Sequence, residues 1–255
     1  MLELSNVSLT EKSILYLNGV SKSFDGFKAI NSLSLFIEPG ELRAIIGPNG
    51  AGKTTMMDLI TGKLKPDSGE IFFRNDIDLT QHDEAEIANL GIGRKFQKPT
   101  VIESLTLFEN LELALKGKRN VFESLFFRLD VAGKARIDEV FETVGLQAKR
   151  QQLAGSLAHG EKQRLEIAVL LVQEPELLLI DEPAAGMTDE ETAQLSVLLK
   201  KISGERSVIV VEHDMEFIRM LDTQVTVLHE GSVLASGSLE QVKQNQRVVE
   251  VYLGR

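Results

Sequence analysis

The sequence predicts an α/β fold with a mostly parallel β-sheet, a set of short strands at its N-terminal end and an inserted helical region. Three observations lead to this prediction. Short apolar segments alternate with helical segments after about residue 175, which is typical of a parallel sheet covered by helices on both faces. A glycine-rich turn joins an apolar strand directly to a helix near residue 50. Residues from about 98 to 174 show mainly the period of helices instead.

The N-terminal part of the chain begins with short strands. Apolar residues that alternate or run together predict four strands, at residues 14–17, 29–37, 42–46 and 69–73. Pro39-Gly40 predicts the turn between the second and the third. A helix is expected at residues 54–62, and a further strand leads toward Gln97.

The middle and the C-terminal part of the chain differ in the periodicity of their apolar residues. Helical periodicity predicts the inserted region, at residues 105–115, 121–129, 135–146 and 160–173. Strands and helices then alternate, with strands at residues 177–181, 207–212, 225–228 and 233–236, and helices at residues 189–202 and 215–221. His229 to Ser232 predict a hairpin turn, and the chain ends in a helical tail.

The composition excludes several classes of protein. A net charge of −10 argues against a general nucleic-acid binder, which normally presents a basic face. The absence of cysteine excludes disulfides and thiolate metal sites and suits a reducing cytoplasm. Apolar runs are strand-sized, and the N-terminus shows no secretory signal. We therefore expect a chain that does not cross a membrane by itself.

The most informative motif is the glycine-rich turn. It matches G-x-x-x-x-G-K-[ST], the loop that surrounds the phosphates of a nucleotide with backbone N–H groups at a helix N-terminus. Lys53 is expected to neutralise the β- and γ-phosphates and Thr54 to bind Mg²⁺. A glycine-rich turn without a ligand is the alternative. We call residues 47–55 the phosphate loop; its members are Gly47, Pro48, Asn49, Gly50, Ala51, Gly52, Lys53, Thr54 and Thr55.

Two later strands end in side chains suited to chemistry. Asp181 and Glu182 follow four apolar residues, at the carboxyl end of a strand, where ligands bind in open α/β sheets. Asp181 is expected to hold Mg²⁺ through its water shell, and Glu182 to face the attacking water. His213 stands at the end of the strand at residues 207–212. Taken alone, either pattern also fits an ordinary polar strand end.

Five motifs in order resemble the ATPase subunits of ABC transporters. They are the phosphate loop, Gln97 after an apolar strand, residues 157–161 before a helix, Asp181-Glu182-Pro183, and His213. The resemblance covers the chain from about residue 14. Residues 93–97 and 183–188 are similar to the branched-chain amino acid and urea importer group, and His159 looks most like the urea-importer ATPases. The resemblance implies an ATP-hydrolysing importer subunit with ATP and Mg²⁺ as cofactors.

The resemblance also implies roles for individual residues. Phe24 looks like the aromatic side chain that stacks on adenine, with Phe27 as second choice and core packing as the alternative for both. Gln97 is similar to the residue that senses the γ-phosphate and Mg²⁺. Glu182 resembles the catalytic glutamate, and His213 the switch histidine at the γ-phosphate. Lys53 joins them in a site that works mainly by positioning and charge neutralisation.

The resemblance also implies a second half of the site. Residues 158–161, which we call the signature segment, resemble the segment that closes on the ATP of another subunit in a head-to-tail dimer; they are Ala158, His159, Gly160 and Glu161.

Three positions depart from the family pattern. Ala158 stands where the family usually has a serine whose hydroxyl donates to the γ-phosphate. His159 replaces the usual glycine; it is expected either to place an imidazole near phosphate or to be a tolerated bulky residue. Thr188 stands where aspartate is usual, which we interpret as a trait of the importer group.

The resemblance implies one P-loop NTPase domain of the RecA-like type over residues 1–255, with an antiparallel β subdomain in its N-terminal part. Residues 1–97 and 175–255 are expected to form the nucleotide-binding core and residues 98–174 the helical subdomain. The expected partners are transmembrane permease subunits, reached through the aromatic-rich helical region that includes Phe122 and Phe126, a second ATPase subunit that is either identical or different, and indirectly a periplasmic solute-binding protein. No nucleic-acid partner is expected.

The expected place of the chain is the cytoplasmic face of the inner membrane, as a peripheral subunit. The expected transported solute is urea or a related small molecule, such as an amide or a branched-chain amino acid. Alternatives are the ATPase of a lipopolysaccharide-type exporter, a soluble ABC ATPase that acts on DNA or ribosomes, and a regulatory module without turnover.

Overall fold

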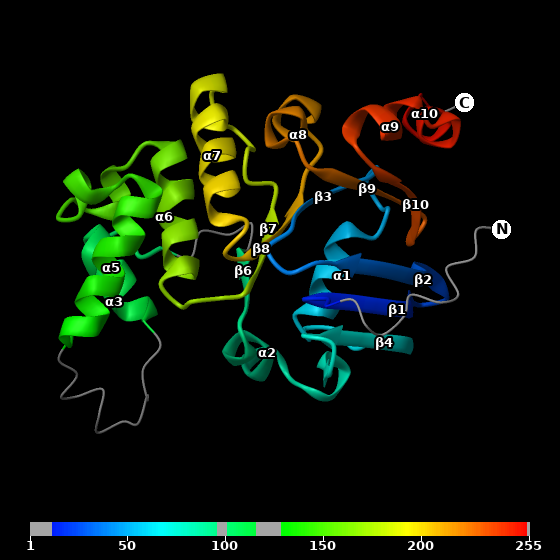
Figure 1. The fold of residues 1–255 in the computed structure, drawn as a ribbon, viewed down its shortest axis with the longest axis horizontal. Coiled ribbons are helices and arrows are strands. Elements are labelled where there is room, and N and C mark those ends of the chain that lie inside the picture. The colour runs from blue at the N-terminus through cyan, green and yellow to red at the C-terminus, as the bar shows by residue number, and fades with distance from the viewer. Residues whose placement is uncertain (1–11, 96–100, 116–128, 254–255) are drawn as a thin grey trace.

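The fold is organised around a six-stranded, mostly parallel sheet (Figure 1). The computed structural model of the chain describes residues 12–95, 101–115 and 129–253. In spatial order the strands are β10 (Ser232–Gly237), β9 (Gln224–His229), β3 (Leu42–Ile46), β8 (Ser207–Val211), β7 (Leu177–Asp181) and β6 (Ile92–Lys95). All neighbours are parallel except β9 and β10, which form the expected antiparallel hairpin. The α/β prediction is confirmed.

A second sheet is antiparallel and is built from two strands before the phosphate loop and two strands after it. Its order is β2 (Phe27–Ile37), β1 (Leu15–Phe24), β4 (Ser68–Phe73) and β5 (Ile77–Asp78). Strand β1 extends seven residues beyond the predicted end at residue 17. Register shifts after Leu17 interrupt the alternation of buried and exposed side chains, so the second half of β1 lacks the pattern by which strands are recognised.

With one exception, the helices follow the predicted order with small shifts of their ends. They are α1 (Lys53–Ile60), α2 (Glu84–Leu90), α3 (Leu107–Ala114), α5 (Val131–Val144), α6 (His159–Leu171), α7 (Asp189–Ile202), α8 (Met215–Leu221), α9 (Leu239–Gln244) and α10 (Gln246–Leu253). Within the described ranges, no helix is long and apolar enough to span a bilayer. The helix expected at residues 121–129 lies almost wholly outside these ranges, as do Phe122 and Phe126.

Helix α2 was not predicted. Only Ile87 of its seven residues is buried, so the segment has no apolar stripe. Its start is marked instead by a capping box, in which Asp83 accepts from the N–H of Glu86 and the Glu86 carboxylate accepts from the N–H of Asp83. The capping residues are therefore a better signal for this helix than its periodicity.

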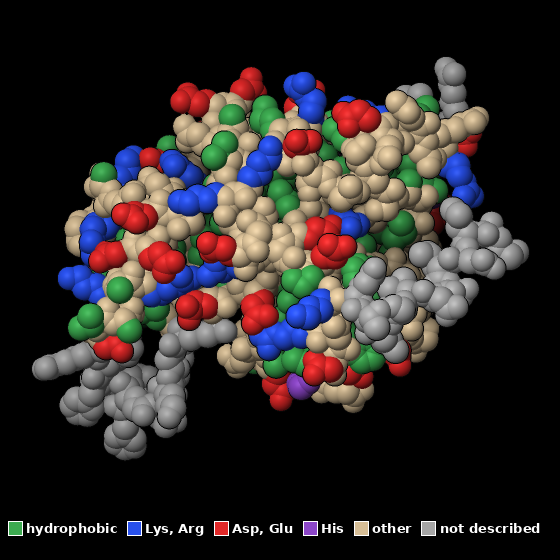
Figure 2. All heavy atoms as spheres, viewed as in Figure 1, with side chains coloured by type: hydrophobic (Ala, Val, Ile, Leu, Met, Phe, Trp, Pro, Cys, Tyr) green, Lys and Arg blue, Asp and Glu red, His purple; other side chains and the backbone are tan. Residues whose placement is uncertain are grey.

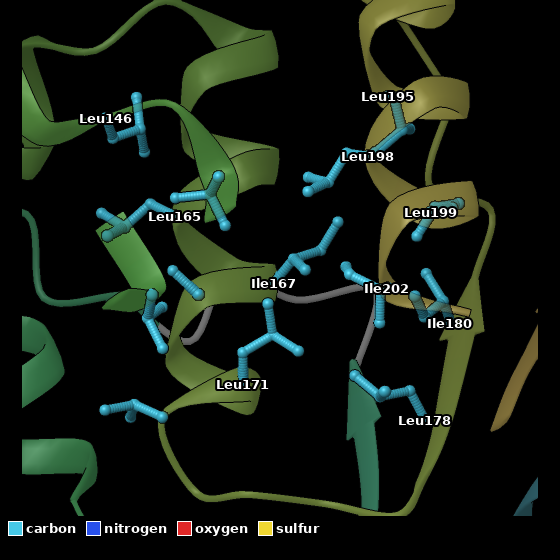
Figure 3. Close-up of a cluster of buried hydrophobic side chains, with 14 of the residues drawn as sticks. Leu146, Leu165, Ile167, Leu171, Leu178, Ile180, Leu195, Leu198, Leu199 and Ile202 are labelled. Atoms are coloured by element: carbon cyan, nitrogen blue, oxygen red, sulfur yellow. The ribbon is translucent and has the colours of Figure 1, made fainter. Parts of the chain in front are cut away.

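Strand β7 shows how the core holds the two parts of the chain together. Its residues are buried on both faces of the sheet, which explains the continuous apolar run. Leu178 and Ile180 belong to a cluster that also contains side chains of α3, α5, α6 and α7. In Figure 3 the two side chains lie to the right of the labelled side chains of α6, with Ile180 beside the lower end of α7. Leu177 and Leu179 belong to a second cluster, with α1 and the antiparallel sheet.

Candidate functional site

The phosphate loop joins β3 to α1, as its motif predicts. Gly52 precedes α1 with a φ of 100°, in the left-handed region that favours glycine, and no side chain caps the helix start. A Cβ atom on Gly47 would lie 2.3 Å from the carbonyl oxygen of Leu228, and one on Gly52 would lie 2.6 Å from that of Ala29. Close backbone packing therefore requires both glycines, and the helix start is open to an anion.

The Lys53 side chain folds back over the loop. Its Nζ donates to the carbonyl oxygens of Gly47 at 2.7 Å and Pro48 at 3.1 Å. Burial lowers the pKa of Lys53, while the charges of Glu182 and Asp181 raise it. The ammonium group thus lies between the loop and the two acids, where it can exchange its carbonyl acceptors for phosphate oxygens.

Asp181 and Glu182 lie in different environments although they are neighbours. Asp181 is buried, and burial raises the pKa of its carboxyl, opposed mainly by Arg94, whose Nη2 lies 3.8 Å from Asp181 Oδ2. Glu182 is partly exposed and has a φ of 45°, an uncommon conformation for a residue with a Cβ. Such strain is often found where a side chain must point into a site, so it supports a functional interpretation of Glu182.

His213 lies against Glu182. The distance between His213 Nδ1 and Glu182 Oε1 is 3.4 Å, and the His213 side chain is 66% exposed. The turn that carries the histidine is held by hydrogen bonds to Glu212, which is 1% exposed. The Glu212 carboxylate accepts backbone N–H groups from His213 at 2.9 Å, Asp214 at 3.3 Å and Ala184 at 3.0 Å. One buried carboxylate therefore positions the loops that follow β7 and β8.

Two adjacent cations on β6 form buried ion pairs toward different elements. Arg94 pairs with Asp58 of α1 as well as approaching Asp181. Lys95 Nζ lies 2.9 Å from Glu166 Oε2 in α6, and both side chains are almost fully buried. Strand β6 thus connects the helix after the phosphate loop with the helix that begins at the signature segment.

The aromatic pair at the β1–β2 hairpin is close in sequence to a backbone contact with the phosphate loop. Phe24 and Phe27 are cross-strand partners, and both are exposed, at 42% and 66%. Lys22 Nζ lies 5.8 Å from the centroid of the Phe24 ring. Ala29, whose carbonyl oxygen approaches Gly52, is two residues beyond Phe27. Their exposure excludes the core-packing alternative.

The signature segment forms the start of α6 and contacts α7 and the loop before it. Ala158 occupies the N-cap position but has no side-chain acceptor. His159 Nε2 lies 3.0 Å from the carbonyl oxygen of Ala185, so its ring donates there when that nitrogen carries a proton. Gly160 N donates to Glu191 Oε1 at 3.1 Å.

Glu161 accepts from the Ala158 N–H at 3.3 Å and from Lys149 Nζ at 2.6 Å. The bond from Lys149 lowers the pKa of Glu161, together with weaker contributions from its other partners and against a cost of burial. The carboxylate therefore ties the start of α6 to the segment before it.

Comparison with known proteins decides the family. A family model described as ABC transporter matches residues 30–185. The high-affinity branched-chain amino acid transport ATP-binding protein LivG of Escherichia coli K12 is 35% identical, over 94% of this chain and 98% of LivG. The chain belongs to the ABC transporter ATPase family. Within these transporters it is of the type that forms the ATP-hydrolysing subunit.

Solved ABC cassettes confirm the fold. A nucleotide-free ATP-binding cassette from an ABC transporter superposes with a TM-score of 0.82 at 28% identity, covering 95% of this chain and all of that one. A dimeric cassette in a post-hydrolysis state, bound to ADP and Pi, superposes with a TM-score of 0.70 at 28% identity, over 88% of this chain and 98% of that one.

Sequence reasoning assigned no role to three residues that shape this ABC site. They are the charged residues Arg94, Lys95 and Glu212, which lie inside or directly after buried strands. A buried charge is costly unless it has a partner, so a charged residue in an apolar strand is the signal that could have identified them. Gln97, predicted to sense the γ-phosphate, lies outside the described residues. His159 is expected either near the phosphate of a partner's nucleotide or as a tolerated residue, and in the single cassette its ring contacts a carbonyl of the same chain.

Proposed function

We propose that this chain binds and hydrolyses ATP to drive uptake of branched-chain amino acids through an ABC importer. The observation that carries the proposal is the convergence of the open α1 start, the Lys53 ammonium and the Glu182–His213 pair at the carboxyl ends of β3, β7 and β8. The solute class follows from the relatives, which are transport ATP-binding proteins for branched-chain amino acids. Urea or another small amide is the second candidate, favoured by His159.

The proposed roles follow from charge and position. Lys53 and the open backbone of the phosphate loop bind the β- and γ-phosphates. Glu182 orients or deprotonates the attacking water, and His213 contacts the γ-phosphate. Phe24, or Phe27, stacks on adenine. The separation of a buried Asp181 from a partly exposed Glu182 suits a division between cation binding and water activation.

The residues present suit Mg²⁺ bound together with a nucleotide. Among the described residues, no group of three or more acidic or histidine side chains is arranged to hold a metal ion, so a cation here needs phosphate oxygens as further ligands. That is the usual donor set of Mg²⁺ at nucleotide sites. Thr54 and Asp181 would hold it, with Gln97 as a third candidate. When bound, Mg²⁺ supplies positive charge that stabilises the charge developing on the phosphates.

We propose further that two ATPase chains pair head to tail, so that the signature segment of one completes the site of the other. This places the N–H of Gly160 at the γ-phosphate of the partner's nucleotide. A similar cassette has been solved as a dimer bound to ADP and Pi, which supports pairing. The partner is either an identical chain or a different ATPase subunit.

The membrane subunits are proposed to dock beside β6. A cavity of about 250 Å³ lies between α2, β6 and α6 and is lined mainly by apolar surface, with Arg94, Lys95 and Glu166 among its lining residues. A helical segment of a permease placed there would contact the strand that leads to Gln97. We propose accordingly that the chain works as a peripheral subunit at the cytoplasmic face of the membrane, with residues 98–174 as its helical subdomain. A periplasmic solute-binding protein would act indirectly, through the permease.

Other kinds of partner are less well supported. On the face shown in Figure 2, basic and acidic side chains are interspersed rather than gathered into a basic face for nucleic acid. A lipopolysaccharide-type exporter would share this ATPase chemistry and would differ in its membrane partners.

Reconstitution with the co-encoded membrane proteins tests the proposal. Proteoliposomes with the intact chain should take up leucine in an ATP-dependent manner, and those with Glu182→Gln should not. Uptake of urea but not leucine would replace the proposed solute. Full uptake with Glu182→Gln would refute the assigned chemistry, and export of a lipid would refute the importer.

A further inference from the structure

The Glu191 carboxylate bridges the first turns of α6 and α7. Its Oε1 accepts the N–H of Gly160 at 3.1 Å. Its Oε2 accepts the N–H of Thr188 at 3.0 Å and the Thr188 hydroxyl at 3.1 Å. Both oxygens are therefore engaged, one of them by the backbone donor that the proposed function gives to a phosphate of the partner's nucleotide.

The carboxylate also fills the space above Gly160. A Cβ atom built on Gly160 would lie 2.6 Å from Glu191 Oε1 and 2.7 Å from its Cδ. A phosphate oxygen cannot approach the Gly160 N–H while this group stays in place. A carboxylate and a phosphate that share one donor also repel each other, because both are anions.

We propose that Glu191 is a positioning residue that blocks the signature segment in the unpaired chain and must release Gly160 before two nucleotide-loaded chains can pair. This inference rests on the proposed function, which assigns Gly160 to the partner's nucleotide. Glu191 acts through the conformation of this segment and takes no part in the chemical step.

Other contacts in the same region favour the blocked arrangement. Hydrogen bonds from the backbone of Thr188 and Gly160 lower the pKa of Glu191, so the side chain is an anion at neutral pH. The capping box with Thr188 holds the carboxylate at the start of α7. Ala158 supplies no hydroxyl to the segment, so backbone donors such as Gly160 N–H carry more of the proposed phosphate contact.

The experiment measures ATP-driven pairing in a background that hydrolyses slowly. Dimer formation by the Glu182→Gln chain is followed by sedimentation velocity as the ATP concentration rises. Adding Glu191→Gln removes the charge but keeps an oxygen acceptor. We expect it to lower the ATP concentration for half-maximal pairing about fivefold, the difference between a charged and a neutral hydrogen bond. ATP binding to the single chain, measured with a fluorescent analogue, should stay unchanged.

The matched control is Glu190→Gln. Glu190 is the preceding residue of α7 and is exposed, so this variant changes the net charge equally without touching Gly160. Its half-maximal ATP concentration should equal that of the parent. If Glu191→Gln fails to fold, Glu191→Ala provides the second variant, with a shift in the same direction.

The outcomes separate this inference from the proposed function. A Glu182→Gln parent that stays monomeric at saturating ATP overturns pairing with an identical chain, which is the one of the two proposed partners that this inference requires, and overturns the inference with it. A parent that pairs, with no gain or with a loss from Glu191→Gln, overturns the inference alone. Equal shifts from the Glu190 and Glu191 variants would assign the effect to net charge and overturn it as well.

Discussion

Replacing Ala158 by serine adds one hydroxyl at the start of α6 and should strengthen both the helix and ATP-driven turnover. Ala158 has the extended conformation of an N-cap residue, with φ −63° and ψ 162°. Its backbone N–H already donates to the Glu161 carboxylate, which is half of a capping box. A hydroxyl at this position completes the box by accepting the N–H of Glu161.

The two effects have different magnitudes. An added N-cap hydroxyl stabilises a helix by about 1 kcal/mol, which raises the melting temperature of a chain of this size by about 2–4 °C. In the proposed pair the same hydroxyl donates its hydrogen to the partner's γ-phosphate. A hydrogen bond to a charged group is worth about 1.5–3 kcal/mol, or about 10- to 150-fold in affinity or rate. A hydroxyl can accept and donate at once, so both effects are expected together.

Thermal unfolding and ATPase rates at subsaturating ATP separate these effects when Ala158→Asp serves as the control. Aspartate also caps the helix, but its carboxylate cannot donate to phosphate and repels it. We expect both variants to melt at a higher temperature, with the ATPase rate raised in Ala158→Ser and lowered in Ala158→Asp. An ATPase rate in Ala158→Ser that is unchanged or lower would refute the role of the hydroxyl at the phosphate.

Three further predictions concern the charges around the site. Glu212→Ala removes the acceptor of three backbone N–H groups and should lower the free energy of unfolding by about 3 kcal/mol, measured in urea. Lys95→Met and Glu166→Met should each lower the free energy of unfolding by about 3–5 kcal/mol. The double variant should lower it much less, because it leaves no unpaired buried charge. Lys149 lowers the pKa of Glu161 below its ordinary 4.5 in the folded chain. This pair therefore stabilises the chain above that pH and ceases to do so as the pH falls through the lowered value, so Lys149→Met should reduce the difference in stability between about pH 6 and about pH 3.

Each of these predictions has a contradicting result. A loss for Glu212→Ala no larger than that for Glu216→Ala, on the exposed side of α8, would show that the buried acceptor is unimportant. Additive losses in the Lys95 and Glu166 double variant would remove the argument from pairing. An unchanged difference in stability between the two pH values in Lys149→Met would assign the acid sensitivity to other groups.

The phosphate loop was predictable because its information is local. Gly47 and Gly52 are needed by turn geometry and close backbone contacts, and Lys53 directly follows them, so nine consecutive residues specify the loop. Strand β3 and helix α7 were also predicted with their observed ends. In each case an apolar pattern and a turn or cap agree within one segment.

The buried charges could not be predicted in the same way. The charge of Lys95 inside a strand is unusual, but its partner Glu166 is far away in the sequence and is an ordinary charged residue of a helix. Only the fold places β6 against α6, and desolvation then makes the pair important. Glu212 directly precedes His213, which was predicted. Its own role could not be predicted, because it depends on the Ala184 N–H from another loop.

The shared apolar cluster on one face of β7 limits how this chain can be redesigned. Side chains of α3, α5 and α6 pack in the same cluster as Leu178 and Ile180, so the described part of residues 98–174 shares its core with the parallel sheet. A chimera could take this segment from another transporter so that the chain binds a different permease. It would then contain one half of an interface whose other half comes from a different sheet. Such grafts should succeed only when the facing positions of β7, β8 and α7 are exchanged together with the segment.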